Sequence, residues 1–170
     1  YLGIMTDTGS FRFPATTNIT HQVVAKLIEA GANNAEIHQQ TLDVNSFERM
    51  QLLGVALKNL NVISEQKTAY IHLNKEELNA HNYQKGDTEG FVNYALSLQG
   101  IVFAVIFIES LDEDLIKISF RSKGEVDVNL FARKYFNGGG HKNAAGGRST
   151  QNLSETISFF KEKLSLHEFE

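Results

Sequence analysis

The longest apolar run of the chain, residues 101–108, limits the folds that the sequence can adopt. All eight of its residues are apolar, a length typical of a strand and far below the ~20 residues of a membrane-spanning helix. A strand without polar positions is buried on both faces, so other layers must cover both sides of its sheet. The run therefore predicts an α/β fold and no association with a membrane.

Residues 115–122 show the alternation of a strand with only one buried face. Lys117, Ser119 and Arg121 share the face opposite to the apolar side chains. A strand of this kind, with a base near its end, can hold an anionic ligand on its polar face. We therefore expect a ligand-binding surface here.

Other periodic patterns predict further elements after residue 62. A strand is expected over residues 68–73, and helices are expected over 127–136 and 153–166. Another helix is expected to begin at a cap formed by Asp87 or Thr88 and to end at Leu98. Six phenylalanines occupy the predicted core faces: Phe91, Phe103, Phe107, Phe120, Phe131 and Phe136.

The first 61 residues have a different pattern. Residues 2–5 predict a short buried strand that leads into a polar turn, and helices are expected over 18–29, 35–42 and 46–60. A lone strand at residue 2 suggests the last strand of a parallel sheet whose other strands lie outside the sequence. The predicted domains are the end of one α/β domain (residues 1–43), a connecting helix (44–61) and a second domain (62–170).

The charge distribution indicates a confined anion site. The chain has a formal net charge of −4, yet residues 117–148 contain seven bases and two acids. A basic segment on an acidic chain favours a focused anion site over a long nucleic-acid surface, and an ordinary solvated face is the alternative. The chain has no cysteine, which excludes disulfides and cysteine nucleophiles and fits a reducing compartment, so we expect a cytoplasmic protein.

Three glycines and a histidine form the sharpest local motif. Gly138, Gly139, Gly140 and His141 lie inside the basic segment, and the small residues 144–147 follow. Without Cβ atoms the backbone N–H groups of such a turn can converge on an anion, and the imidazole can add a donor. The alternative is a flexible hairpin in which the histidine is incidental.

Arg121, Ser122 and Lys123 offer a second set of anion contacts at the end of the one-sided strand. Arginine binds phosphate through two parallel hydrogen bonds, and a serine hydroxyl can donate another. An arginine at the solvent end of a strand is also common. Asp7 follows the first apolar stretch, where open α/β sheets place catalytic or metal-binding carboxylates, although a turn or helix cap would explain it as well.

Together these motifs resemble the DHH phosphoesterase family, in the branch that cleaves very short RNA and 3′-phosphoadenosine 5′-phosphate. Residues 3–11 look like the family's fourth motif, and residues 88–93 look like the start of a family helix. Residues 120–129 and 138–146 look like the substrate-binding face of the DHH-associated domain. The first three family motifs, including the Asp-His-His triplet, are absent, so the resemblance implies the C-terminal part of a longer enzyme. The associated domain would be a mixed β-sheet flanked by helices.

The resemblance also implies a mechanism, two-metal phosphodiester hydrolysis with Mn²⁺. Asp7 would be a catalytic metal ligand, and Arg121, Ser122, Lys123 and residues 138–141 would hold the substrate phosphate. The implied partners are short RNA oligonucleotides or nucleotides and the N-terminal DHH domain, and a homodimer is compatible. The alternatives are a cyclic or linear dinucleotide phosphodiesterase, an exopolyphosphatase of the same family, and a nucleotide-binding module without activity.

Overall fold

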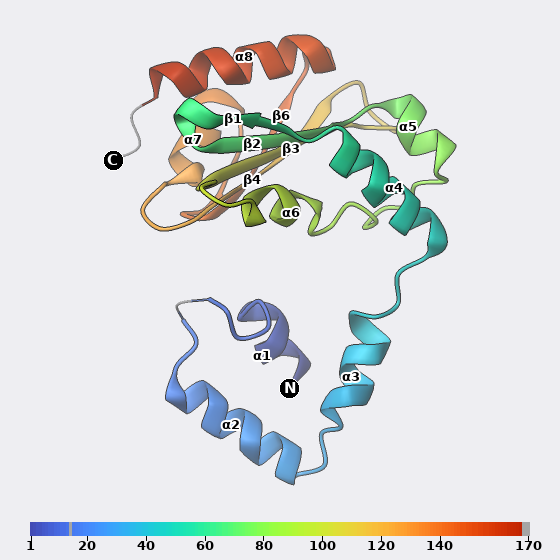
Figure 1. Ribbon diagram of the computed structural model, residues 1–170, viewed down its shortest axis with the longest axis vertical. Coiled ribbons are helices and arrows are strands. Elements are labelled where there is room, and N and C mark those ends of the chain that lie inside the picture. The colour runs from blue at the N-terminus through green and yellow to red at the C-terminus, as the bar shows by residue number, and fades with distance from the viewer. Residues whose placement is uncertain (14, 168–170) are drawn as a thin grey trace. The chain divides into compact units, whose positions relative to one another are not determined.

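The computed structural model describes residues 1–13 and 15–167, and the chain divides into two compact units, Tyr1–Ser46 and Phe47–Glu170 (Figure 1). The division after Ser46 means that the helix expected to connect two domains packs with the second unit. Across the described ranges, no helix combines the length and the apolar character that crossing a bilayer requires.

The first unit consists of the helices α1 (Leu2–Asp7), α2 (Asn18–Glu29) and α3 (Asn34–Thr41). A capping box between Thr17 and Thr20 starts α2, and the Asn33 side chain caps α3. The helices predicted over 18–29 and 35–42 are therefore confirmed. Of the described apolar side chains in this unit, only those of Met5 and Val24 are buried, so the unit has a very small core of its own.

The strand predicted for residues 2–5 is wrong, because these residues form α1. A strand needs a neighbouring strand to satisfy its N–H and C=O groups, and the described part of the first unit contains none. A helix satisfies these groups locally, as Met5 N–H does with Tyr1 C=O at 3.0 Å. A four-residue apolar run has too little periodicity to distinguish the two structures.

The second unit is built on a six-stranded mixed sheet with the order β1-β2-β3-β4-β6-β5. The parallel pair is β2 with β3, and the other neighbouring pairs are antiparallel. The strands are β1 (Asn61–Ile63), β2 (Thr68–Leu73), β3 (Phe103–Glu109), β4 (Ile116–Ser122), β5 (Gly139–His141) and β6 (Ala144–Ser149). The strands predicted over 68–73, 101–108 and 115–122 are confirmed. The glycine-rich segment forms β5 and β6, two strands that were not predicted.

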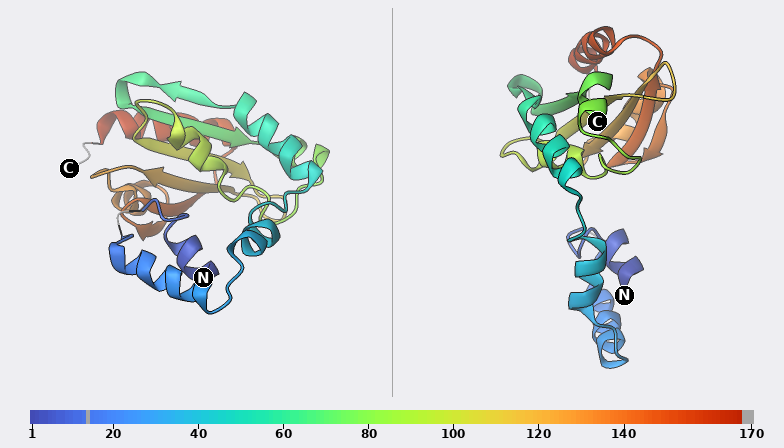
Figure 2. Two further views of the ribbon diagram at one scale, coloured as in Figure 1. Left: turned by 60° about the horizontal axis from the view of Figure 1, so that its bottom comes forward. Right: turned by 90° about the vertical axis from the view of Figure 1, so that its right-hand side faces the viewer.

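Helices cover both faces of β3, as its apolar sequence requires. On one face, Phe103, Val105 and Phe107 pack with residues of α7 (Val128–Tyr135) and α8 (Leu153–Leu166). On the other face, Ala104 and Ile106 pack with the remaining helices (Figures 1 and 2). These are α4 (Phe47–Lys58), α5 (Lys75–Ala80) and α6 (Phe91–Ser97). A short 3₁₀ helix, η1 (Ser64–Gln66), joins β1 to β2.

Aromatic side chains dominate the core on the α7 and α8 face. The Phe131 ring lies edge-on to Phe103 and Phe120, with centroid separations of 5.5 and 5.9 Å. Such edge-to-face pairs stabilise a core beyond the area that they bury. All six phenylalanines expected in the core are buried.

Helix α6 begins later than predicted. Gly90 precedes its first residue with φ +82°, a left-handed conformation that favours glycine. The Asp87 carboxylate instead accepts a hydrogen bond from Gln84 N–H at 2.7 Å, which closes a turn before the helix. The Arg49 guanidinium of α4 donates to the carbonyls of Asp87 and Glu89 and so fastens this turn to α4.

The end of α8 contains a histidine with a perturbed environment. The His167 ring lies edge-on to Phe131 and Tyr135, with centroid separations of 5.1 and 5.7 Å. Burial, followed by the charge of Lys134, lowers the pKa of His167 from its ordinary value. The folded protein therefore favours the neutral imidazole.

Stability is expected to decline in mild acid because of His167. Since its pKa is lower in the folded state, the unfolded chain binds the proton more readily. This contribution is fully present above the unfolded pKa of about 6.5 and is lost as the pH falls through the folded pKa. Melting temperatures between pH 7.5 and 5 should fall less steeply for His167→Phe, which keeps an aromatic ring. Identical slopes for the two proteins would refute this.

Candidate functional site

On β4 and β6, the side that faces away from α7 and α8 carries exposed and half-exposed side chains. In β4 the side chains of Ile116, Ile118 and Phe120 join the core, so the alternate residues point to the other side. The register of β4 with β6 places the alternate residues of β6 beside them. We call this surface the open face; its residues are Lys117, Ser119, Arg121, Ala144, Gly146 and Arg148.

Arg121 is half-buried on the open face between small neighbours. The strand register aligns Ala104, Arg121 and Ala144 across three adjacent strands, and His141 of β5 pairs with Ala144. The Arg121 Nη1 atom donates to the Phe120 carbonyl at 2.8 Å, which fixes one side of the guanidinium. Burial lowers the pKa of Arg121, but an arginine in a protein stays charged. The row therefore presents a fixed cation, and His141 at its end is exposed.

Gly146 leaves the centre of the open face without a side chain. It pairs with Ser119 on one side and Gly139 on the other. A Cβ atom added to Gly146 would meet only the Ile118 carbonyl oxygen, at 3.6 Å, an ordinary contact. Packing within the chain therefore does not require glycine here, and the bare backbone leaves room for a ligand.

The glycine motif does not form the expected anion-binding turn, because residues 139–141 are the edge strand β5. Gly138 N–H donates to the Ala132 carbonyl at 3.2 Å, and Gly140 N–H donates to Asn129 Oδ1 at 3.0 Å. A Cβ atom on Gly138 would collide with the Gly146 carbonyl oxygen. The motif is thus a tightly packed hairpin, and at least two of its N–H groups are used within the chain.

Asn129 fastens the glycine hairpin to α7. Its Oδ1 atom accepts hydrogen bonds from Gly140 N–H and Arg133 Nε–H, both at 3.0 Å. Asn129 lies in the segment 120–129 that resembles a substrate-binding face, but its structural role was not predicted, because this contact joins positions that are close only after folding.

Replacing Asn129 with alanine is expected to loosen β5. Loss of the two hydrogen bonds should lower the free energy of unfolding by about 1–2 kcal/mol. The amide of Gly140 should exchange its hydrogen faster, as hydrogen-exchange NMR or mass spectrometry would show. Asn93→Ala, on the exposed side of α6, is the matched control. An unchanged exchange rate at Gly140 would show that Asn129 does not hold the strand.

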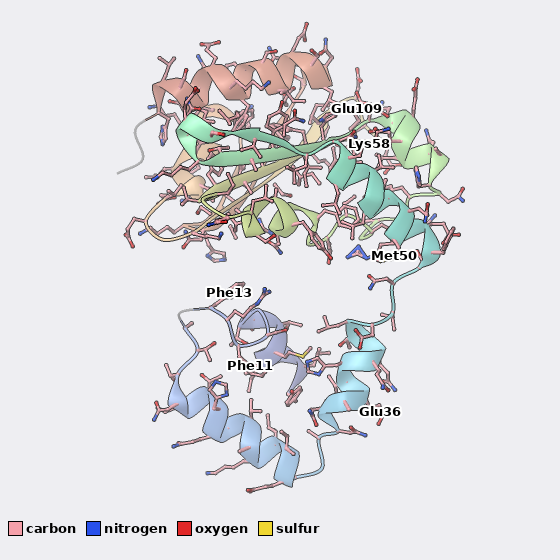
Figure 3. All side chains as sticks on the ribbon, viewed as in Figure 1. Phe11, Phe13, Glu36, Met50, Lys58 and Glu109 are labelled. Carbon is pink, nitrogen blue, oxygen red and sulfur yellow. The ribbon has the colours of Figure 1, made fainter. Side chains whose placement is uncertain are left out.

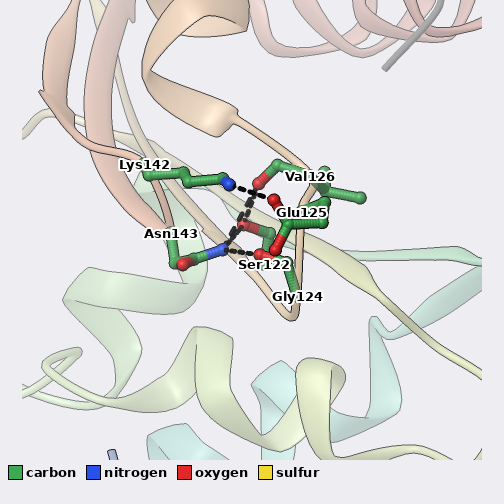
Figure 4. A network of polar contacts seen from close by, with 6 residues as sticks. All are labelled: Ser122, Gly124, Glu125, Val126, Lys142 and Asn143. Atoms are coloured by element: carbon green, nitrogen blue, oxygen red, sulfur yellow. Dashed lines mark hydrogen bonds and ion pairs between the residues drawn. The ribbon is translucent and has the colours of Figure 1, made fainter. Parts of the chain in front are cut away.

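The structure does not bring Ser122 onto the open face. Its buried hydroxyl donates to the Val126 carbonyl at 2.6 Å and accepts from Asn143 Nδ2 at 2.8 Å (Figure 4). Asn143 also donates to the Gly124 carbonyl, so these contacts tie the turn after β4 to the hairpin tip. At the surface of the same network, Lys142 Nζ and Glu125 Oε2 form an ion pair of 2.5 Å.

Lys123 lies beyond the end of β4 and reaches back to the start of β3. Its Nζ atom donates to the Ile101 carbonyl at 3.1 Å, and its N–H donates to the Val102 carbonyl at 2.9 Å. Of the predicted phosphate-binding side chains, the strand register brings together Arg121 and His141, whereas Ser122 and Lys123 make structural contacts.

Asp7 is the exposed last residue of α1 in the first unit. Within the described ranges, no group of three or more histidine, aspartate or glutamate side chains is arranged to hold a metal ion. A two-metal centre needs several such ligands. The described residues therefore do not make a Mn²⁺ centre by themselves.

A separate groove of about 500 Å³ lies on the α8 side of the sheet. Its lining residues are Val62, Ile63, Ser64, Glu65, Gln66, Lys161 and Leu164. Its lining contains one acidic and one basic side chain and no arginine. The groove is therefore a weaker candidate for an anion site than the open face.

Residues 65–166 of the chain match the model of the DHHA1 domain family. The chain is 34% identical over 146 residues to the bifunctional oligoribonuclease and PAP phosphatase NrnA of Bacillus subtilis, covering 86% of the chain and 45% of that protein. It is 33% identical over 144 residues to the NrnA of Thermus thermophilus, covering 85% and 42%. The crystal structure of an exopolyphosphatase-related protein from Bacteroides fragilis has a TM-score of 0.91 at 35% identity, covering 95% and 47%. The chain thus spans about half the length of these relatives.

Proposed function

The chain belongs to the DHHA1 domain family of DHH phosphoesterases, and we propose that it forms the substrate-binding part of a longer hydrolase. The proposed substrates are short oligoribonucleotides and nucleoside 3′,5′-bisphosphates. The relatives named NrnA support the substrate class, because their names specify an oligoribonuclease and PAP phosphatase. The observation that carries the proposal is the fixed, half-buried Arg121 guanidinium beside the bare backbone of Gly146.

The open face can bind a phosphate through Arg121. One side of its guanidinium is held by the Phe120 carbonyl, which leaves other N–H groups for two parallel hydrogen bonds to phosphate oxygens. His141, at the end of the same row, can donate a further hydrogen bond. Gly146 allows the ligand to approach the sheet closely, since no side chain stands above it. This surface is short, which suits an oligonucleotide of a few residues better than long RNA.

The longer protein would also need a metal centre, and we propose that it uses Mn²⁺ with Asp7 as one ligand. Asp7→Asn is expected to abolish Mn²⁺-dependent hydrolysis by that protein and to leave its melting temperature unchanged, since Asp7 is exposed. This chain alone should bind Mn²⁺ only weakly in calorimetry, because Asp7 lacks described co-ligands. Retained metal-dependent turnover in the variant would remove Asp7 from the reaction.

The first unit is proposed to dock on the remaining part of the longer protein. Its α2 helix exposes Ile19, Val23 and Ile28, while the described unit buries only two apolar side chains. Burial of such side chains drives association, and a 46-residue unit with so small a core gains little from folding alone. The proposed partner is the DHH domain that the family resemblance implies.

A competition panel tests the proposed substrate class. The unlabelled competitors are a diribonucleotide, a nucleoside 3′,5′-bisphosphate, a cyclic dinucleotide and inorganic polyphosphate, against a labelled 5′-phosphorylated diribonucleotide and without metal. The first two should compete best. Equal competition by polyphosphate, which has no base, would favour the exopolyphosphatase alternative. Preference for the cyclic ligand would favour the dinucleotide phosphodiesterase.

A further inference from the structure

Two bases face each other on the open face without an acidic partner. Lys117 of β4 pairs in register with Arg148 of β6, and both side chains are exposed. Ion pairs of the described chain join Lys142 with Glu125 and Lys163 with Glu162, and neither Lys117 nor Arg148 takes part in one. In the same described part, neither side chain makes a hydrogen bond.

The repulsion between these two cations destabilises the protein when no anion is bound. Directly opposite residues of antiparallel strands have Cβ atoms about 4.5–5.5 Å apart, and like charges at that position are destabilising. The neighbouring position on β3 is the apolar Ile108, which cannot offset the charge. An anion between Lys117 and Arg148 would remove the repulsion and satisfy both cations.

The pair also lies in line with Arg121. Lys117 is four residues from Arg121 on the same strand and the same face, which corresponds to about 13 Å at the usual strand rise. Between them lies the row of Ser119 and Gly146, where no large side chain stands. An extended chain of phosphates could therefore run from one cationic position to the other along the strand.

We propose that Lys117 and Arg148 form a second phosphate site, which takes a phosphate further along the oligonucleotide whose first phosphate binds Arg121. The inference rests on the proposed function. A nucleotide with a single phosphate occupies only one of the two sites, whereas an oligonucleotide of several residues occupies both. The second site therefore favours oligonucleotides over mononucleotides.

The acidic loop between β3 and β4 limits the length of ligand that the open face can bind. Asp112, Glu113 and Asp114 are exposed between β3 and β4, next to the Lys117 end of β4. None of these acids lies within ion-pair distance of Lys117 or Arg148 in the described structure. They would repel a polyanion that extended past the second site, so the binding surface suits short oligonucleotides.

A salt titration of two ligands tests the second site. Binding of a 5′-phosphorylated mononucleotide and of a 5′-phosphorylated tetraribonucleotide would be measured without metal for the unmutated chain and for Lys117→Gln/Arg148→Gln. The double variant should bind the tetranucleotide several-fold more weakly. Its slope of log K against log salt should be smaller by about 0.7 for each phosphate that the variant no longer neutralises. Mononucleotide binding should be unchanged.

Lys58→Gln, an exposed base at the end of α4, is the matched control and should change neither ligand's affinity (Figure 3). Removing the repulsion should also preserve or raise the melting temperature of the double variant at low salt, which separates a binding defect from a folding defect. An unchanged tetranucleotide affinity and slope, or an equal loss for both ligands, would overturn the second site alone. If the unmutated chain bound neither ligand, the proposed function and the second site would both be wrong.

Discussion

Replacing Arg121 with alanine is expected to weaken binding of a 5′-phosphorylated diribonucleotide by about 1.5–3 kcal/mol, which is roughly 10- to 150-fold in Kd. The loss is large because the guanidinium is half-buried and held by the Phe120 carbonyl, so it binds phosphate with little loss of side-chain freedom. Arg121→Lys keeps the charge and loses the paired hydrogen bonds, so it should give an intermediate Kd.

Calorimetry or fluorescence anisotropy without metal would measure these constants. Lys58→Ala removes an exposed charge from α4, which contributes no residue to the open face, and should leave Kd unchanged. Equal Kd values for Arg121→Ala and the unmutated chain would show that the guanidinium does not touch the ligand.

Valine at two adjacent glycines is expected to affect stability at one and ligand binding at the other. At Gly147 a new Cβ would lie 2.8 Å from Phe136 Cβ and 3.1 Å from Phe120 Cε2, inside the core. Overpacking of this kind should lower the free energy of unfolding by about 1–3 kcal/mol. At Gly146 the nearest atom would be the Ile118 carbonyl oxygen at 3.6 Å, on the open face. There valine should preserve stability, because it favours strands, and should block the ligand.

Chemical denaturation and the diribonucleotide titration, applied to both variants, separate the two roles. Neither glycine has a positive φ, so backbone strain does not confuse the comparison. Gly146→Val with full ligand affinity would show that the ligand binds elsewhere. A Gly147→Val protein as stable as the unmutated chain would contradict the tight packing of this glycine against the two phenylalanines.

Much of the second unit was predictable because its signals are local. The apolar run of β3 requires cover on two faces, and the alternation in β4 assigns Arg121 to the polar side. The helix α8 carries its own capping residues and has the predicted bounds, as α2 does in the first unit. In each case the residues that decide the structure are neighbours in sequence.

The errors concern features that depend on distant contacts. α1 forms because no strand of the described first unit can pair with it, which a four-residue pattern cannot reveal. The glycine motif suggested a phosphate loop, but the close approach of Gly138 to Gly146 makes it a hairpin. Ser122 looked like a substrate donor, but its hydroxyl bonds to Val126 and Asn143 instead.

The most direct test of the central claim is to map the ligand on the protein by NMR. Amide chemical shifts of the chain would be followed while a 5′-phosphorylated diribonucleotide is added without metal. The largest changes are expected on β4 and β6, at residues 117–121 and 144–148, and at His141. Changes centred on the groove between η1 and α8, near Glu65 and Lys161, or no changes at all, would contradict binding at the open face.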